Sequence, residues 1–461
     1  MSEAPAQPNG DRRELKRSLG TFDSIMMMVG IVVGSGIFLT TGIMAESLPS
    51  PGLVLMAWMV GGALTLAGAL TFAELGASMP EAGGPYIYLR EAYGHVWGFL
   101  FGWKMFVVSM GGSIAALGVG FAEYVGYFWP GVSAGNVVLS LPLLDVSSAQ
   151  LLALGVILLL STFNYLGVGY GKGIQNVVTT LKIATLVLFI GIGFAMGGVG
   201  VVGTEISVSP SAPSSSLLVG FGVALIAVSW AFDGWNNITY IAGEIRDPGR
   251  RLPMALIGGT FLITALYLLV NVVYFSALPM SEVVGEVRIA EKASTALWGP
   301  TGAALVSGAV VVSTFGALNG AIFVGPRVYY AMAQDGVFFE RAAKIHAHFG
   351  TPSAAILAQA VWAGFLTLTG SYEQLFTYVV VVSLIYWIAT AASVFTLRKK
   401  RPELHRPYVT WGYPWVPLIF IVSTGAVLIN ALFARPIESL AGLSITLLGV
   451  PVYFYWRRKV T

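Results

Sequence analysis

The stretch Val29-Gly-Ile-Val-Val-Gly-Ser-Gly-Ile-Phe38 lies inside the first long apolar segment of the chain, about residues 24–47. A bilayer-spanning α-helix needs about 20 apolar residues, so this segment is long enough. Gly34-Ser35-Gly36 falls near its middle, and each glycine weakens a helix by up to roughly 1 kcal/mol. Because unpaired backbone groups are costly in lipid, a break here must face protein or a water-filled cavity. The exposed amides of a broken helix attract a carboxylate, and its free carbonyls attract an ammonium, so the stretch suits a zwitterion.

The same glycines have a second interpretation, because Gly30 and Gly34 form a G-x-x-x-G that lets membrane helices pack closely. The sixth apolar segment, Val228-Ser-Trp-Ala-Phe-Asp-Gly-Trp-Asn-Asn-Ile238, favours the break, since its polar residues also interrupt an apolar helix. Segments 1 and 6 are five spans apart, so the second copy runs the opposite way across the membrane. Paired interruptions in two inverted halves indicate the binding site of a transporter.

Composition identifies a polytopic membrane protein. Of 461 residues, 56% are hydrophobic and only 10% are charged, and the mean hydropathy is +0.78; soluble domains carry about 25% charged residues. The chain has no cysteine, which excludes disulfides and thiolate metal sites. The net charge of +3 is spread over loops and does not indicate nucleic acid as a partner.

The distribution of basic residues predicts the orientation in the membrane. Nineteen lysines and arginines fall in one set of loops and three in the other. Because cytosolic loops are the more basic ones, we expect the chain in the plasma (inner) membrane with both termini in the cytosol. The polar residues 1–20 lack the apolar core of a signal peptide and are expected to form a cytosolic tail. Twelve apolar segments are expected, at about 24–47, 51–78, 98–128, 149–168, 174–198, 216–244, 252–277, 300–333, 354–370, 373–397, 412–432 and 438–456.

Several motifs occur in a recognisable order. They are Gly34-Ser-Gly-Ile-Phe38, Phe72-Ala-Glu-Leu-Gly76, Pro80-Glu-Ala-Gly-Gly-Pro-Tyr86, Trp230-Ala-Phe-Asp-Gly-Trp-Asn236, Gly243-Glu-Ile-Arg-Asp-Pro248, Phe315-Gly-Ala-Leu-Asn-Gly320 and Arg327-Val-Tyr-Tyr-Ala-Met-Ala333. Together they resemble the amino acid–polyamine–organocation (APC) superfamily, and the chain is most similar to its L-type amino acid transporter branch. The resemblance implies an amino acid transporter rather than an enzyme, without cofactors, that works by alternating access.

The resemblance also implies the fold: an all-α, polytopic LeuT-type bundle of twelve transmembrane helices, with helices 1 and 6 broken at mid-membrane. Its two inverted repeats of five helices would occupy 21–200 and 201–400, followed by two peripheral helices and a short cytosolic tail at 401–461.

Two departures from the family pattern matter. Pro326 replaces the usual small polar residue before Arg327, where it could kink segment 8. The missing cysteine excludes a disulfide-linked heavy subunit, so we expect a monomer that works alone.

The substrate site implied by the resemblance lies at the two breaks. Backbone amides of Ser35, Gly36 and Ile37 would bind the carboxylate of the substrate. Its ammonium would face carbonyls on the residues Ile31, Val32, Trp230 and Phe232, because an ammonium has donors only. Trp230 would close over the substrate, although a tryptophan beside a helix break could also serve packing alone.

Asp233 has two open interpretations. An acid at membrane depth is a functional candidate and could bind a cationic substrate side chain. Equally, Asp is a good N-cap and could cap the second half-helix. Asn236 and Asn237 could hold the unwound backbone, and Asn236 is favoured for contact with the substrate.

Lys182 lies inside the fifth apolar segment, where a charge is costly unless it is paired. Its candidate hydrogen-bond partners are the side chains of Thr179, Thr180, Ser313 and Thr314. In the family, a lysine at this position takes the place of a sodium ion, which argues against sodium coupling here. Lys182 could carry a proton instead, or remain a fixed cation that locks segment 5 to segment 1.

Charged residues near the cytosolic segment ends are candidates for an inner gate. Ion pairs among Glu74, Glu244, Arg246 and Arg327 could hold this end shut, while ordinary solvated loop charges are the alternative, above all for Arg246. No catalytic constellation or metal site is recognisable, since His346 and His348 lack a third ligand nearby.

These observations predict a sodium-independent exchanger of neutral L-amino acids. A proton-coupled symporter using Lys182 is the alternative, and a non-transporting amino acid receptor is a third possibility. The sequence leaves open which amino acids are carried.

Overall fold

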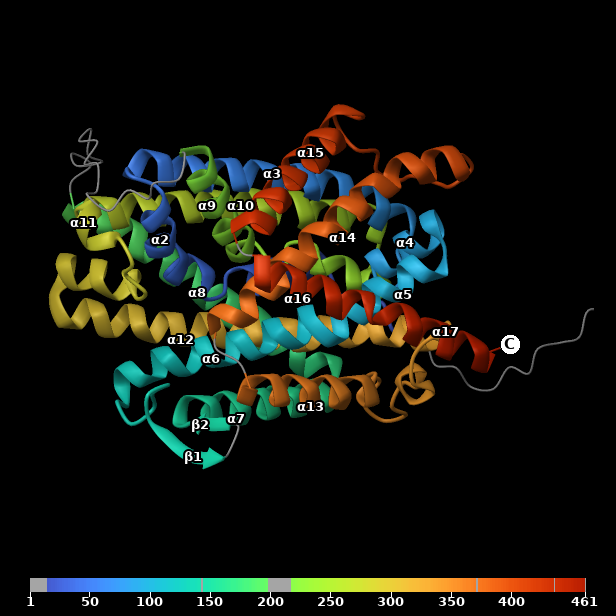
Figure 1. Cartoon of the computed structure of the whole chain (residues 1–461), viewed down its shortest axis with the longest axis horizontal. Helices are drawn as coiled ribbons and strands as arrows, with labels where there is room; N and C mark the ends of the chain where they lie inside the picture. Colours follow the sequence, from blue (N-terminus) through green and yellow to red (C-terminus); the bar gives the residue numbers. More distant parts are fainter. Residues whose placement is uncertain (1–14, 142–143, 198–216, 370–371, 435, 461) are drawn as a thin grey trace, which may run out of the picture.

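The computed structural model describes residues 15–141, 144–197, 217–369, 372–434 and 436–460, and its long helices lie side by side in one bundle (Figure 1). Within this part of the chain, ten helical runs are long and apolar enough to cross a membrane. Two shorter apolar helices, α9 (Leu217–Ala231) and α13 (Ser353–Thr369), add to them. The chain is therefore a multi-pass membrane protein, and the figure of twelve spans stays a prediction.

The helices follow the predicted apolar segments closely. In the first half they are α1 (Thr21–Val32), α2 (Gly36–Ser47), α3 (Pro51–Ser78), α4 (Pro85–Tyr93), α5 (His95–Lys104), a π-helical turn (Met105–Met110), α6 (Gly111–Phe128), α7 (Ser148–Tyr165) and α8 (Val168–Gly197). In the second half, α9 is followed by a 3₁₀ helix (Asn237–Glu244), α10 (Pro248–Ala277), α11 (Met280–Val283), α12 (Ile289–Gln334), a 3₁₀ turn (Glu340–Ala343), α13, α14 (Tyr372–Lys400), α15 (Trp415–Ala434), α16 (Pro436–Leu447) and α17 (Gly449–Val460).

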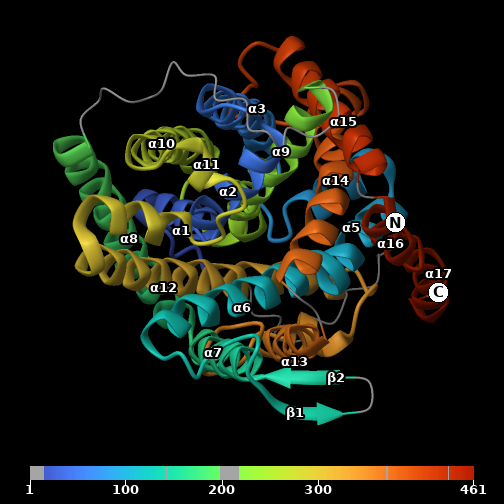
Figure 2. The same cartoon turned by 60° about the vertical axis from the view of Figure 1, so that its left-hand side comes forward.

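The first helix is interrupted where the glycines predict it, because α1 ends at Val32 and α2 begins at Gly36. The sixth is interrupted as well, since α9 ends at Ala231 and a turn leads to the 3₁₀ helix that begins at Asn237. Figure 2 shows α1 and α2 in the middle of the bundle, between α3 and α10 on one side and α12 on the other. A helix that is apolar on all faces belongs inside the protein, and these two carry almost no charge.

The outer helices present apolar side chains to their surroundings. Phe433 on α15, Leu218 on α9 and Val361 on α13 are 84%, 81% and 73% exposed. Exposed apolar surface on this scale suits contact with lipid rather than water.

The structure agrees with the all-α fold class, and one loop adds a short β-hairpin that the sequence analysis did not predict. Residues between α6 and α7 form an antiparallel hairpin of β1 (Val137–Leu141) and β2 (Leu144–Ser147), which lies at the edge of the bundle beside α7 (Figure 2). The hairpin lies outside the apolar segments, where alternation over such short strands gives little signal. Ser147 ends β2 and caps α7, since its hydroxyl accepts a hydrogen bond from the Gln150 amide.

Helix α12 continues through Pro326 without a break in its helical backbone. Inside α12 the backbone leaves helical angles at Gly299, where φ is 70°, and stays helical around Pro326. A proline removes the amide that would bind the carbonyl four residues earlier, which is that of Ile322. This carbonyl instead accepts a hydrogen bond of 3.3 Å from Gln359 Nε2 on α13. The neighbouring helix therefore satisfies the backbone group that the proline frees.

The domain limits predicted from the resemblance stay predictions. The boundary between residues 200 and 201, and most of the tail at 1–20, lie outside the described residues. In the described part of the tail, residues 15–20, Leu19 is buried and forms an isolated parallel β-bridge with Ile245.

Candidate functional site

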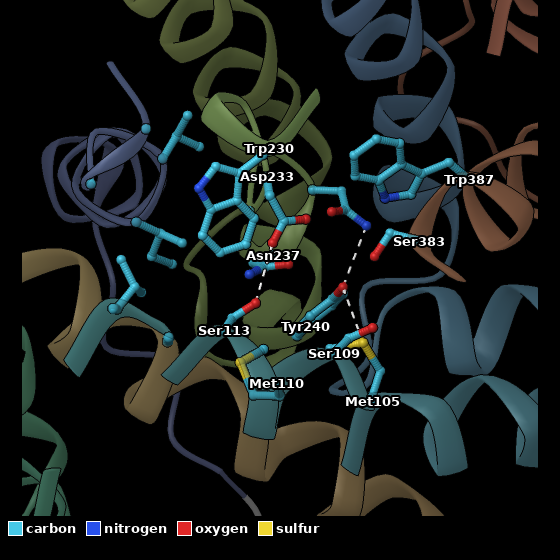
Figure 3. A pocket seen from close by; sticks show the side chains of 18 of the residues that line it. Met105, Ser109, Met110, Ser113, Trp230, Asp233, Asn237, Tyr240, Ser383 and Trp387 are labelled. Carbon is cyan, nitrogen blue, oxygen red and sulfur yellow. Dashed lines mark hydrogen bonds between the residues drawn. The ribbon is translucent and has the colours of Figure 1, made fainter. Parts of the chain in front are cut away.

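Both helix breaks open onto one pocket, which holds about 590 Å³ of atom-free space, part of it open to solvent. Figure 3 shows its polar side chains pointing inward from the second break, the π-helical turn, α6 and α14. The lining residues are Ile31, Val32, Gly34, Ser35, Gly36, Lys104, Met105, Ser109, Met110, Ser113, Leu117, Trp230, Asp233, Gly234, Asn236, Asn237, Tyr240, Ala321, Ser383 and Trp387. Polar groups from segments distant in sequence thus converge on one apolar-walled cavity.

The first break offers helix-end amides to this pocket. Gly34, Ser35 and Gly36 line it, and α2 begins at Gly36, so the amide end of this helix lies at the pocket. One amide of its first turn, that of Phe38, donates to the Ser35 carbonyl at 3.1 Å. Ile37, predicted with them, does not line the pocket; its side chain is buried, and its carbonyl accepts a hydrogen bond of 3.5 Å from the Tyr274 hydroxyl.

Three of the carbonyls predicted to face an ammonium, those of Val32, Trp230 and Phe232, already accept hydrogen bonds within the protein. The Val32 carbonyl accepts hydrogen bonds from the Gly34 amide at 2.8 Å and from the Tyr267 hydroxyl at 3.0 Å. The Trp230 carbonyl accepts one from the Asp233 amide at 2.9 Å. A carbonyl oxygen has two lone pairs, so one hydrogen bond from the protein does not by itself exclude a second donor.

Phe232 does not line the pocket. Its carbonyl accepts a hydrogen bond from the Trp235 amide at 3.2 Å, and its ring packs against Trp58 and Tyr267, with centroids 6.3 and 5.2 Å away. Its side chain therefore packs against other aromatic rings outside the pocket lining.

Tyr267 on α10 is a site residue that the sequence analysis missed. Its buried hydroxyl lies 3.0 Å from the Val32 carbonyl and 3.1 Å from the Ala231 carbonyl, so one group contacts the ends of both α1 and α9. The breaks also approach closely at Gly36, where an added Cβ would lie 2.6 Å from the Ala231 Cα. A tyrosine in an apolar helix gives no sequence signal of such a role, because its partners are backbone atoms.

Trp230 and Asp233 both face the pocket (Figure 3). The Asp233 carboxylate accepts a hydrogen bond of 3.4 Å from the Ser113 hydroxyl. The N-cap of the following 3₁₀ helix is Asn236 rather than Asp233, and no side-chain cap bond forms there. Asn236 instead donates to the Tyr240 hydroxyl at 3.4 Å. The Asp233 side chain therefore lines the pocket and is not the N-cap of the 3₁₀ helix, while its contact with a substrate stays a prediction.

Lys104, at the end of α5, is the second charge in the pocket. It is 2% exposed, and its Nζ donates to Ser109 Oγ at 3.1 Å and to Ser383 Oγ at 3.5 Å. The rings of Phe101 and Tyr386 lie 5.1 and 5.4 Å from this nitrogen. A charged residue inside an apolar segment is the signal that identified Lys182, and the sequence analysis did not apply it to Lys104.

Lys182 lies outside this pocket, behind the first break. Its Nζ donates to three backbone carbonyls, those of Gly30 at 2.9 Å, Val33 at 2.7 Å and Ser313 at 2.8 Å. The side chain of Ser313 takes part indirectly, because its hydroxyl donates to the same Val33 carbonyl at 2.9 Å. The ammonium thus joins α8 to the end of α1 and to α12.

The threonine partners proposed for Lys182 are wrong. Thr179 donates to the Met26 carbonyl at 3.1 Å, Thr180 to the Asn176 carbonyl at 2.8 Å, and Thr314 to the Val310 carbonyl at 2.9 Å. Threonines in helices commonly bind the carbonyl one turn earlier, which is what Thr180 and Thr314 do.

The charges proposed for an inner gate separate into two groups. Arg327 on α12 makes two hydrogen bonds to Glu244, of 2.7 and 3.3 Å, and both side chains are only 1% exposed. Glu74 on α3 does not join them. It binds Arg398 at the end of α14, with distances of 2.9 and 2.7 Å, and accepts from the Thr410 amide at 2.8 Å.

Arg246, the fourth of these charges, is exposed and donates to the Arg17 carbonyl at 3.4 Å. A further pair that the sequence did not suggest joins Arg90 on α4 to Asp335, whose carboxylate also accepts a hydrogen bond of 2.6 Å from the Tyr86 hydroxyl. The pairs Arg327–Glu244, Arg398–Glu74 and Arg90–Asp335 therefore each connect residues from different elements.

Comparison with known proteins gives consistent results along the whole chain. A family model described as "Amino acid permease" matches residues 19–450. The serine/threonine exchanger SteT of Bacillus subtilis (strain 168) is 31% identical over 449 residues, which cover 96% of this chain and 98% of that protein. The large neutral amino acids transporter small subunit 2 of Rattus norvegicus is 30% identical, covering 99% of this chain and 84% of that protein. The b(0,+)-type amino acid transporter 1 of Homo sapiens is also 30% identical, with coverages of 97% and 91%.

Proposed function

Because the chain belongs to the amino acid permease family of the APC superfamily, we propose that it exchanges neutral L-amino acids across the membrane, independently of sodium, by alternating access. The membership predicted from the motifs is confirmed, and the chain is an amino acid transporter rather than an enzyme. The proposal concerns the mode of transport and the class of substrate. The observation that carries it is the single pocket onto which both helix breaks open.

A zwitterion fits the polarity of this pocket. The substrate carboxylate would bind the helix-end amides at Ser35 and Gly36, which carry the positive end of the α2 dipole. The substrate ammonium would bind carbonyls at the C-terminal ends of α1 and α9, at Ile31 and Trp230. The indole of Trp230 would close over the bound molecule. The side chain of the substrate would then extend toward Asn236, Asp233 and the residues of α6.

Lys182 supports independence from sodium. Its ammonium already binds three carbonyls between α1, α8 and α12, and a sodium ion would need such oxygens as ligands. A cation that stays fixed suits an exchanger, because no ion then has to bind and leave in each cycle. A lysine that released its proton on each cycle would give proton-coupled uptake, which is the alternative mode.

The relatives point in the same direction. One similar protein is named a serine/threonine exchanger, and it matches this chain over nearly its full length. Another is named a transporter of large neutral amino acids. Its name describes a small subunit, whereas the absence of cysteine from this chain excludes a disulfide-linked heavy subunit. We propose a monomer that works alone.

The architecture of alternating access forms part of the proposal. We propose twelve spans in a LeuT-type arrangement, in which α9 with its 3₁₀ helix and α13 complete the count and residues 21–200 and 201–400 form inverted repeats. Both termini would face the cytosol of the plasma (inner) membrane. The broken helices with α3 and α10 would rock against the other helices, and the ion pairs Arg327–Glu244 and Arg398–Glu74 would open when the site faces inward.

Reconstitution tests this function directly. Proteoliposomes with the purified full chain are either left empty or preloaded with unlabelled L-serine, and uptake of radiolabelled L-serine is measured with and without a sodium or an inward proton gradient. Uptake that requires preloading and ignores both gradients supports exchange. Uptake into empty vesicles driven by protons would replace exchange with symport, and binding without any flux would indicate a receptor.

A further inference from the structure

The substrate pocket contains two charged side chains of opposite sign, Lys104 and Asp233, and every other residue that lines it is neutral. Lys104 is buried and Asp233 is partly buried, and they come from α5 and from the second helix break, 129 positions apart in the sequence. The pocket as a whole therefore carries no net charge. This balance exists only because the fold brings the two segments together.

Lys104 has no carboxylate as a direct partner. Both residues belong to the described part of the chain, and no nitrogen–oxygen distance of 4.0 Å or less joins Lys104 to Asp233. The lysine binds the serine hydroxyls of Ser109 and Ser383, and the aspartate binds the Ser113 hydroxyl. A buried charge is costly unless an opposite charge compensates it, and Asp233 is the charge that attracts Lys104.

The two charges limit which substrate side chains can bind between Lys104 and Asp233. A cationic side chain would approach Asp233 but would meet Lys104, and like charges brought together in a desolvated site cost several kcal/mol. An anionic side chain would meet Asp233 in the same way. A hydroxyl or a carboxamide can donate to the aspartate and accept from the lysine, so both charged groups keep a hydrogen-bond partner.

Resting on the proposed function, we propose that Lys104 is a specificity-determining residue. By compensating Asp233 across the pocket, it excludes amino acids with a charged side chain and favours those with a hydroxyl or a carboxamide. Asp233 alone would make this a site for cationic substrates. With Lys104 present, the same aspartate becomes a hydrogen-bond acceptor for neutral ones.

The first test measures the selectivity of the unmodified protein. Exchange of radiolabelled L-serine is competed with unlabelled L-glutamine, L-arginine and L-glutamate in preloaded proteoliposomes. We expect L-glutamine to inhibit at concentrations at least about tenfold lower than L-arginine or L-glutamate. Inhibition by L-arginine or L-glutamate as strong as that by L-glutamine overturns the proposal. A protein that exchanges no neutral amino acid contradicts the proposed function itself, which keeps the two failures apart.

The second test removes the lysine. In Lys104→Met the arginine-to-serine uptake ratio should rise at least about tenfold. Asp233 then has no positive charge from the protein opposite it, and the guanidinium of the substrate L-arginine can take that place. The double variant Lys104→Met/Asp233→Asn should lose this gain. Lys172→Met is the matched control, since it removes a lysine that lies 3.2 Å from the Asp23 carboxylate, outside the pocket. The uptake ratio of this control should equal that of the unmodified protein.

Folding is checked by gel filtration of each variant. If Lys104→Met does not fold, Lys104→Gln replaces it, because a carboxamide can still bind Ser109 and Ser383. An uncharged variant that folds, exchanges L-serine and still rejects L-arginine overturns the proposal, and so does an arginine gain that persists in the double variant.

Discussion

The Nζ atom of Lys182 lies 2.7 Å from the carbonyl oxygen of Val33, the residue that directly follows the end of α1. Carbonyls in the last turn of a helix have no amide partner within it, and the helix dipole makes this end negative. An ammonium on α8 therefore stabilises the broken end of α1. The contact ties a scaffold helix to the wall of the substrate pocket.

Replacing Lys182 by alanine should impair transport more than binding. The variant loses hydrogen bonds from a charged donor, each worth about 1.5–3 kcal/mol, and we expect the exchange rate to fall at least about tenfold. Serine binding to purified protein should weaken by less than that factor, because Lys182 does not line the pocket. Lys172→Ala serves as the control. Exchange by Lys182→Ala at the rate of the unmodified protein, with equal protein in the vesicles, would refute a central role for this lysine.

Tyr267→Phe should weaken substrate binding without unfolding the protein. The change removes the hydroxyl that contacts the carbonyls of Val32 and Ala231, and a neutral hydrogen bond contributes about 1 kcal/mol, or roughly fivefold in affinity. Tyr274→Phe is a matched control on the same helix, because its hydroxyl lies 3.5 Å from the Ile37 carbonyl and its bond is weaker. Competition of labelled serine exchange gives both affinities. Equal losses in the two variants would show that Tyr267 has no special part in joining the breaks.

Gly36→Ala should abolish most of the exchange activity. The new methyl group would lie 2.6 Å from the Ala231 Cα, so the two breaks would have to move apart. Overpacking of this kind costs about 1–3 kcal/mol, and the shift would displace the amides proposed to bind the carboxylate. Gly155→Ala on α7 has no atom within 4 Å of the added group and should exchange normally. The hypothesis fails if both alanine variants transport serine equally well.

Glu244→Gln should lower the stability of the protein. It leaves the Arg327 guanidinium, which is 1% exposed, without its opposite charge, and breaking a buried pair in this way costs about 3 kcal/mol. Thermal unfolding of the purified protein in detergent measures the effect as a lower midpoint. Arg288→Ala disrupts the pair with Glu291, in which the arginine is 45% exposed, and should shift the midpoint little. An unchanged midpoint in Glu244→Gln would mean that water or another group compensates Arg327.

The sequence by itself determined the membrane class, the positions of both helix breaks and the family. Glycines and polar residues inside apolar segments are informative because lipid cannot satisfy free backbone groups. A break at Gly34–Gly36 or at Asp233–Asn237 therefore has to face protein or a water-filled cavity. The same reasoning marked Lys182 and Asp233, since an unpaired charge in an apolar segment is too costly to persist.

Only the tertiary structure decided which groups meet. Lys182 binds backbone carbonyls of three residues rather than the threonines near it in sequence, and Glu74 binds Arg398, 324 positions away. Such pairs depend on the rotation and depth at which one helix packs against another, and sequence spacing fixes neither across separate helices. For this reason the sequence did not predict that Lys104 of α5 and Asp233 of the second break line the same pocket.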